Sequence, residues 1–243
     1  MVQALPTPQA PQLAPVPQTQ TQRPAMMMSA DEAQFGGTLR IVAAGSIQSF
    51  DPLWTTASGT GNVSNTILEG LFEYTSDYGI APLLIESWDS SDDNLSWTFK
   101  LREGIKFHDG TPLTTEQVQG TLNRQKDRAP ILRLVRNEFG AGDGEFEEFL
   151  TVEDDLHFSL NLKEGTGLVI DAIGPQGFGP RLVTADWYDN YTANQSAEGP
   201  PNGTGPFIFE EWLPGDRWSA TRYEDYSPHP APRAAHRRTY RLC

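Results

Sequence analysis

Residues 97–118 are the stretch that most restricts how this chain can fold. Apolar and polar side chains alternate over residues 97–102, and this period of two predicts a strand with one buried face. Asp109-Gly110 predicts a tight turn, because Gly accepts positive φ and the Asp side chain can bond to its own backbone. A strand followed by a turn contains no catalytic chemistry of its own.

The end of this stretch predicts a helix start. Thr114 followed by Gln117 forms a capping-box pattern, in which the Thr hydroxyl would accept a bond from the first turn of the helix. Val118 and Leu122 lie one turn apart and would share the buried face of that helix.

Other segments predict a mixture of strands and helices. Residues 39–43 predict a strand, and apolar residues within 63–71 predict a helix with one buried stripe. Residues 156–162 predict the clearest alternating strand of the chain. Residues 207–209 and 218–221 predict a β-hairpin whose turn is Pro214-Gly215-Asp216. This mixture indicates an α/β or α+β architecture.

Charge and cysteine content exclude several classes of protein. The net charge is −14, which argues against nucleic-acid binding, because such binding needs a basic face to displace counterions. Cys243 is the single cysteine, so neither an internal disulfide nor a cysteine-based metal site can form. No apolar run is long enough to span a bilayer, and no secretion signal can be read.

Both ends differ in composition from the centre. Residues 1–35 contain a Pro- and Gln-rich stretch that cannot bury enough apolar surface to fold, and they are expected to be a disordered linker. Residues 228–243 contain four Arg and no acidic residue, and they are expected to be an aberrant basic tail that is also disordered.

Short motifs stand in a fixed order on both sides of residues 97–118. They are Gly36-Gly37-Thr38-Leu39-Arg40, Phe50-Asp51-Pro52, Asn62-Val63-Ser64, Leu68-Glu69-Gly70-Leu71, Pro82-Leu83, Glu86-Ser87-Trp88, Val152-Glu153-Asp154, Gly203-Thr204-Gly205-Pro206-Phe207 and Glu211-Trp212-Leu213-Pro214-Gly215-Asp216. Together with the central stretch, they resemble the family-five extracellular solute-binding proteins of ABC importers, the oligopeptide, dipeptide and nickel-binding type.

The resemblance implies an α/β fold of the periplasmic-binding-protein type, type II with three lobes, with only its N-terminal portion present. Members of that family are about twice as long, so the chain is expected to be a truncated member without the C-terminal ligand-gripping lobe. The expected parts are a linker (1–35), the first lobe (36–72), an inserted second lobe (73–185), a return to the first lobe (186–227) and the basic tail (228–243).

The loop between Gly45 and Gly61 is the candidate binding site. It follows the first predicted strand and precedes a helix, which is where open α/β folds bind ligands. In the family, the stretch after the Asp-Pro pair lines the ligand cleft, and this resemblance implies that Trp54, Thr56 and Ser58 contact the solute. An ordinary surface loop remains the alternative interpretation.

The resemblance also implies the function. The chain is expected to bind a small solute, an oligopeptide, outside the membrane and to deliver it to the permease subunits of an ABC importer. We expect a monomer that is not an enzyme, needs no cofactor or metal, binds no nucleic acid and touches the membrane only through a lipid anchor missing from this sequence.

Two alternative functions stay open, a secreted hydrolase and a non-catalytic interaction domain. His108-Asp109 is the pair that most invites a catalytic interpretation, but neighbours in an extended segment point to opposite faces. No nucleophile motif accompanies them. A structural role in the turn is therefore the favoured interpretation of this pair.

Overall fold

The structure is a computed structural model that describes residues 36–42, 47, 49–50, 58–75, 79–126, 133–140, 146–174, 180–184, 201–226 and 241–242. Met1–Gly36 forms a separate unit, and the description below concerns Gly37–Cys243. The linker predicted at 1–35 lies outside the described residues. Of the tail predicted at 228–243, only Arg241 and Leu242 are described.

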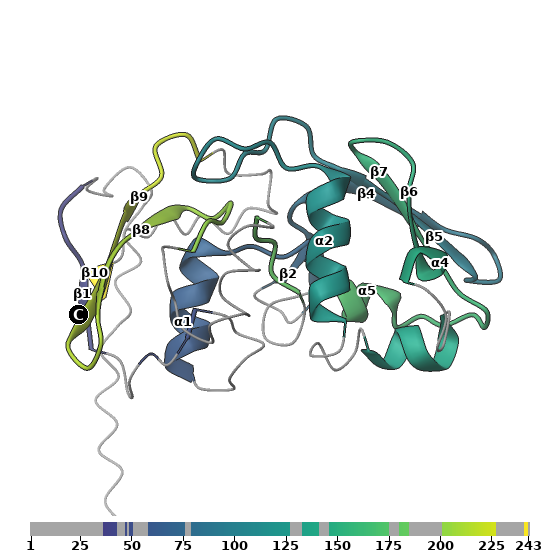
Figure 1. The fold of residues 1–243 in the computed structure, drawn as a ribbon, viewed down its shortest axis with the longest axis horizontal. Coiled ribbons are helices and arrows are strands. Elements are labelled where there is room, and N and C mark those ends of the chain that lie inside the picture. The colour runs from purple at the N-terminus through teal and green to yellow at the C-terminus, as the bar shows by residue number, and fades with distance from the viewer. Residues whose placement is uncertain are drawn as a thin grey trace, which may run out of the picture. The chain divides into compact units, whose positions relative to one another are not determined.

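An antiparallel sheet of four strands is built from the central part of the chain (Figure 1). Its order is β4 (Ile85–Ser90), β5 (Ser96–Leu101), β7 (His157–Asn161) and β6 (Leu150–Val152). The predicted strand at 97–102 is therefore confirmed as β5, next to the centre of the sheet.

The two faces of β5 differ as the alternation predicts. Trp97, Phe99 and Leu101 are buried, whereas Thr98 is exposed. The ring of Phe99 stacks on that of Phe158 in β7, with centroids 5.0 Å apart, so the buried face of the sheet carries aromatic pairs as well as aliphatic contacts.

The strand predicted at 156–162 is confirmed, but its alternation is less strict than the sequence suggests. Phe158 and Leu160 are buried, and Ser159 between them is buried too. Ser159 lies on the opposite face, where its hydroxyl donates a hydrogen bond to the carboxylate of Glu153. That bond satisfies the hydroxyl, so burial of a polar residue is tolerated there.

Helix α2 (Thr115–Gln125) begins where predicted, but the capping box is wrong. Thr114 is the N-cap residue, yet its side chain makes no capping hydrogen bond. The start of the helix is held instead by Thr115, whose backbone N–H donates to Asp155 O at 2.9 Å and whose hydroxyl donates to Asp154 O. The turn between β6 and β7 therefore takes the place of the cap.

Helix α1 (Ser58–Ile67) is followed by the short antiparallel strands β2 (Phe72–Tyr74) and β3 (Ile80–Pro82). The predicted helical stripe is only partly helical, because α1 ends at Ile67. Leu68 and Leu71, which the stripe included, lie beyond the helix and are nevertheless buried.

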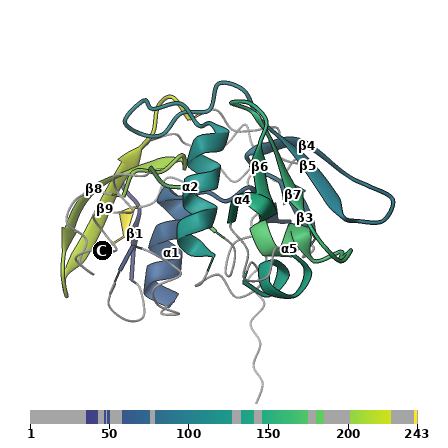
Figure 2. The same ribbon diagram turned by 45° about the vertical axis from the view of Figure 1, so that its right-hand side comes forward.

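The predicted hairpin is confirmed as β8 (Phe207–Leu213) and β9 (Arg217–Arg222). Gly215 has φ +81° in the connecting turn, a conformation that favours Gly. β1 (Arg40–Ile41) is shorter than predicted and pairs in parallel with β10 (Arg241–Leu242). Both views show β1 and β10 beside the hairpin (Figures 1 and 2).

Three short helical segments complete the described residues. A π-helical turn, η2 (Val135–Phe139), precedes α4 (Phe146–Phe149), and α5 (Val169–Ile173) follows β7. Val169, Ala172 and Ile173 of α5 are buried, so this single turn belongs to the core.

The buried apolar side chains form two clusters. The larger runs from Leu71 to Leu182 and includes the inner face of the four-stranded sheet. The smaller combines α1, Val183 and the β8–β9 hairpin. The chain passes between the clusters at Leu68–Leu71 and again at Leu182–Val183. The lobe boundaries predicted after residues 72 and 185 lie close to these crossings and stay a prediction.

Candidate functional site

The candidate binding loop is described only at its two ends. Trp54 and Thr56 lie outside the described residues. Ser58 is the first residue of α1, and its side chain lies outside them as well. The structure therefore places one of the three predicted residues, at the N-terminal end of a helix, and does not test whether the three contact a solute.

Phe50 lies within this loop, directly before the residues that the structure does not describe. Its ring is 1% exposed and makes edge contacts with Phe209 and Trp212 of β8, each with centroids 5.2 Å apart. The hydroxyl of Ser64 in α1 donates to the carbonyl oxygen of Phe50 at 2.6 Å. Phe50 is therefore tied to both α1 and the hairpin.

The first turn of α1 carries the small residues Ser58, Gly59, Thr60 and Gly61. The first N–H groups of a helix have no partner within the helix, and they attract negative charge. Small side chains in this turn limit how much of these groups they can cover. A helix start of this kind suits a polar or anionic group of a solute.

Thr60 is a residue that the sequence reasoning missed. It is fully buried, and within the described part of the chain its hydroxyl is one of the few buried side-chain groups without a hydrogen-bond partner. One signal in the sequence could have found it. Thr60 is the next residue in the alternating series Trp54, Thr56 and Ser58, and it lies in the first turn of α1.

His108 connects two of the sequence motifs. Its Nε2–H donates to the carbonyl oxygen of Gly205 at 2.8 Å, and its backbone N–H donates to Gly203 O at 2.9 Å. The imidazole lies against the ring of Tyr223 in an edge arrangement, with centroids 5.1 Å apart. These hydrogen bonds hold the turn at residues 107–110 against the segment before β8.

The geometry of the His108-Asp109 pair agrees with the structural interpretation. Burial lowers the pKa of His108 below its usual 6.5, and the bond to Gly205 opposes this only in part. Asp109 accepts a hydrogen bond from Thr111 N at 2.8 Å, as expected for a side chain that closes its own turn. The imidazole and the carboxylate are thus engaged with different backbone groups.

Glycines allow this segment to cross α1 closely. Gly205 N donates to Ile67 O at 2.9 Å, and a Cβ at Gly203 would lie 2.1 Å from the same oxygen. Thr204 between them donates its hydroxyl to the buried carboxylate of Glu69 at 2.9 Å. The Gly-Thr-Gly motif is therefore required by packing at the end of α1.

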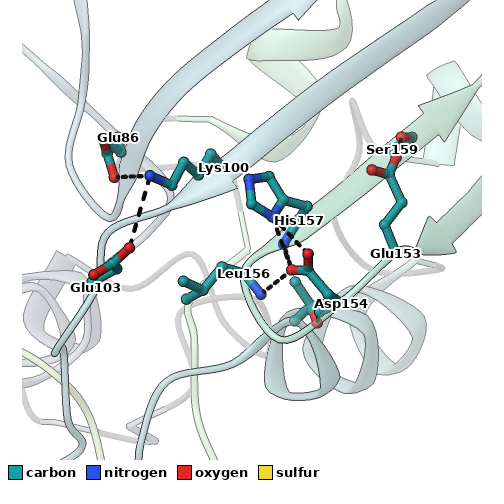
Figure 3. A network of polar contacts seen from close by, with 9 residues as sticks. Glu86, Lys100, Glu103, Glu153, Asp154, Leu156, His157 and Ser159 are labelled. Atoms are coloured by element: carbon teal, nitrogen blue, oxygen red, sulfur yellow. Dashed lines mark hydrogen bonds and ion pairs between the residues drawn. The ribbon is translucent and has the colours of Figure 1, made fainter.

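The exposed face of the four-stranded sheet carries charged networks (Figure 3). Lys100 Nζ lies 3.0 Å from Glu86 and 3.9 Å from Glu103, and the hydrogen bond with Glu86 raises the pKa of Lys100. Asp154 accepts hydrogen bonds from Leu156 N and from His157, and these lower its pKa. Exposed pairs of this kind add little stability and mark a solvated face.

Within the described ranges, no group of three or more His, Cys, Asp or Glu side chains is placed to hold a metal ion. In the same part of the chain, no helix has the length and apolar character needed to cross a membrane.

A family model matches residues 79–237, and its description is "Bacterial extracellular solute-binding proteins, family 5 Middle". The match covers more than half of the chain. It includes the four-stranded sheet, α2 and the β8–β9 hairpin.

Curated relatives agree with this match. The oligopeptide-binding protein AppA of Bacillus subtilis is 27% identical over 206 residues, which are 82% of this chain and 36% of AppA. The glutathione-binding protein GsiB of Pectobacterium atrosepticum is 29% identical over 194 residues, 76% of this chain and 34% of GsiB. The chain thus spans about a third of the length of these relatives.

Solved structures share the fold. The periplasmic binding protein AgaA of A. tumefaciens R10, in complex with agropinic acid, has a TM-score of 0.65 and 28% identity; the match covers 78% of this chain and 36% of AgaA. The relatives named here are binding proteins for solutes, and the shared fold covers about a third of each of them.

Proposed function

Because this chain belongs to the bacterial extracellular solute-binding proteins of family 5, we propose that it forms part of a binding site for a short peptide that an ABC importer takes up. The observation that carries the proposal is the family match over residues 79–237. Peptide is the favoured solute because AppA is an oligopeptide-binding protein and GsiB binds glutathione, itself a peptide. The chain carries out no covalent chemistry in this proposal.

The proposed site is the loop before α1 together with the first turn of that helix. Trp54 supplies an apolar contact, and the hydroxyls of Thr56 and Ser58 supply hydrogen bonds. Thr60 supports this placement, since a buried hydroxyl without a partner is the kind of group that a bound polar ligand satisfies. The first N–H groups of α1 would bind the carboxylate of a peptide.

The proposed setting follows from the relatives. The protein acts outside the cytoplasmic membrane as a monomer and passes its solute to permease subunits. Residues 1–35 act as a spacer that holds it near the membrane. The net charge of −14 favours this setting over one that involves nucleic acid.

Affinity of this chain by itself is expected to be low. The resemblance implies that relatives enclose the ligand between two lobes, and this chain spans about a third of their length. Each charge-assisted hydrogen bond from a second lobe would contribute about 1.5–3 kcal/mol. Without two or three of them, the dissociation constant is expected to be about millimolar or weaker.

A titration of the ¹⁵N-labelled chain with di- to pentapeptides, followed by NMR, tests the proposal. Peptides at about 1–10 mM should shift the amide signals of Gly59, Thr60 and Gly61, with a dissociation constant in the millimolar range. The variant Trp54→Ala should weaken this binding. Trp88→Ala, which removes a half-exposed aromatic ring from β4, is the matched control and should not.

Two outcomes contradict the proposal. If no amide in the first turn of α1 responds to any peptide, the loop is an ordinary surface loop. If the peptide signals decay with time into those of cleaved products, the chain is a hydrolase.

A further inference from the structure

Glu69 lies where the chain leaves the smaller cluster and enters the larger one. It follows Leu68 directly and precedes Leu71 by two residues, and it is 4% exposed. Its carboxylate accepts hydrogen bonds from Thr204 Oγ1 at 2.9 Å and from Tyr226 OH at 2.8 Å. These two donors flank the β8–β9 hairpin, so one carboxyl group ties both ends of the hairpin to the end of α1.

The second crossing of the chain, at Leu182–Val183, is hydrogen-bonded to the same residue. Leu182 N donates to the carbonyl oxygen of Glu69 at 2.9 Å. Arg181, next to it, is 1% exposed, and its Nη2 donates to Asn65 Oδ1 of α1 at 3.0 Å. Gly70 makes room for this guanidinium, because a Cβ there would lie 3.0 Å from Arg181 Nη1. Both passages between the clusters therefore meet at Glu69.

The groups around Glu69 have opposing effects on its pKa. Burial raises its pKa from 4.5 to about 7, and the nearby carboxylate of Glu73 acts in the same direction. The hydrogen bonds from Tyr226 and Thr204 and the charge of Arg181 act in the opposite direction. Arg181 itself has its pKa lowered by burial to about 10, so it is still a cation at neutral pH. Tyr226 has its pKa raised by burial and keeps its proton.

We propose that the Glu69 carboxyl group is a protonation-sensitive contact between the two clusters. It holds the clusters together more strongly when it carries a proton than when it is ionised. Opening of the crossing hydrates the carboxyl group and restores its ordinary acidity. The closed form therefore binds a proton more strongly than the open form. By linkage, the equilibrium between closed and open shifts toward open as pH rises from about 4.5 to about 7, by up to tenfold for each pH unit.

Native-state hydrogen exchange tests this device, with the amide of Leu182 as the reporter of the crossing. After correction for the intrinsic effect of pH on exchange, the protection of Leu182 should fall on the order of tenfold between pH 5.5 and pH 7. Between pH 7.5 and pH 8.5 it should be nearly constant. The amide of Leu101, which donates to Leu156 O within the larger cluster, serves as the reference.

Variants assign the effect to Glu69. Glu69→Gln should remove the pH dependence of Leu182 protection, whereas Glu86→Gln, which changes an exposed carboxylate on β4, should leave it intact. Tyr226→Phe removes a donor that lowers the pKa of Glu69, so it should move the transition to higher pH. Because His108 also titrates, the decisive quantity is the difference between wild type and variant at each pH.

The proposal is overturned if Leu182 protection in the wild type does not change with pH relative to Leu101, or if Glu69→Gln keeps the full dependence. If Glu69→Gln does not fold, Tyr226→Phe decides, and an unshifted transition overturns the proposal. The test involves no solute, so its outcome is independent of peptide binding.

Discussion

His108 and Gly205 are joined across 97 positions of sequence by a 2.8 Å hydrogen bond between the imidazole Nε2 and the glycine carbonyl oxygen. The two residues belong to the most recognisable motifs of the chain, at 107–110 and 203–207. Each motif supplies a hydrogen-bonding partner for the other beside α1: His108 donates, and the carbonyl oxygens of Gly203 and Gly205 accept. The motifs therefore report on packing, and the solute-binding residues have to be sought elsewhere.

Replacement of His108 by Ala should destabilise the protein by about 1–3 kcal/mol, because the buried Gly205 carbonyl oxygen loses its partner. Urea unfolding followed by circular dichroism measures this change. His157→Ala is the matched control. His157 is half-exposed and bonds to Asp154 at the surface, so its loss should change the unfolding midpoint much less.

The same residue should make stability depend on pH. The folded protein disfavours the charged imidazole, so the pKa of His108 lies below the 6.5 of the unfolded chain. As pH falls below about 6.5, the unfolded chain takes up a proton that the folded chain does not, and stability decreases. Glu69 contributes a pH dependence of the opposite sign in both proteins, so the informative quantity is the difference between them. Between pH 7 and pH 5 the unfolding midpoint of the wild type should fall relative to that of His108→Ala. Equal slopes in the two proteins would contradict it.

Gly203→Ala should be strongly destabilising. The added Cβ would lie 2.1 Å from Ile67 O, so the backbone would have to move, which costs roughly 1–3 kcal/mol or more. Gly61→Ala is the control within α1. In the described part of the chain, no atom outside the helix backbone and the neighbouring residues lies within 4 Å of the Cβ position there, and Ala should stabilise the helix by up to about 1 kcal/mol. Thermal unfolding should therefore shift in opposite directions for the two variants.

Thr60→Val tests whether the Thr60 hydroxyl is without a partner. Val has nearly the same shape, and removal of an unsatisfied buried hydroxyl should stabilise the protein by about 1 kcal/mol, or ~2–4 °C in melting temperature. Thr121→Val is the matched control, since the hydroxyl of Thr121 is buried and bonds to Val183 O at 3.3 Å. That variant should be destabilised, and a destabilised Thr60→Val would show that its hydroxyl is satisfied.

Phe99→Ala should destabilise the protein by about 3–5 kcal/mol, because Phe99 is 2% exposed and lies between Phe158 and Phe72. Trp88→Ala removes a larger ring that is 42% exposed and contacts Phe72 from one side. It should have a smaller effect. Chemical denaturation of both variants measures how much unfolding free energy each one loses. Equal losses would mean that the buried face of β5 is misassigned.

Local patterns were sufficient for β5, for β7 and for the β8–β9 hairpin. The alternation at 97–102 predicted β5, and the turn residues at 214–216 predicted the hairpin, because strand faces and turn geometry depend on neighbours in sequence. The capping box failed for a related reason. Thr114 has the right neighbours, but the start of α2 is held by Asp154 and Asp155 of a distant turn, which no local pattern contains.

The candidate site shows the same limit. Ser58 was predicted to lie in the loop before a helix, whereas it is the first residue of α1. The burial of Thr60 depends on segments that are distant in sequence, so no local pattern indicates it. Glu69 was part of a motif used for the resemblance, and nothing local indicates that its carboxyl group is buried. Its burial follows from Thr204 and Tyr226, which lie 135 and 157 positions away.

The order of the two clusters along the chain has a consequence for biosynthesis. The larger cluster uses one continuous segment, Leu71–Leu182, so it can form as soon as that segment has left the ribosome. The smaller cluster needs α1 and the β8–β9 hairpin together, and Phe207 follows Ile67 by 140 positions. The apolar face of α1 therefore stays exposed to solvent until the hairpin has been synthesised. During that interval the nascent chain exposes an apolar surface that is prone to aggregation, and a chaperone could protect it there.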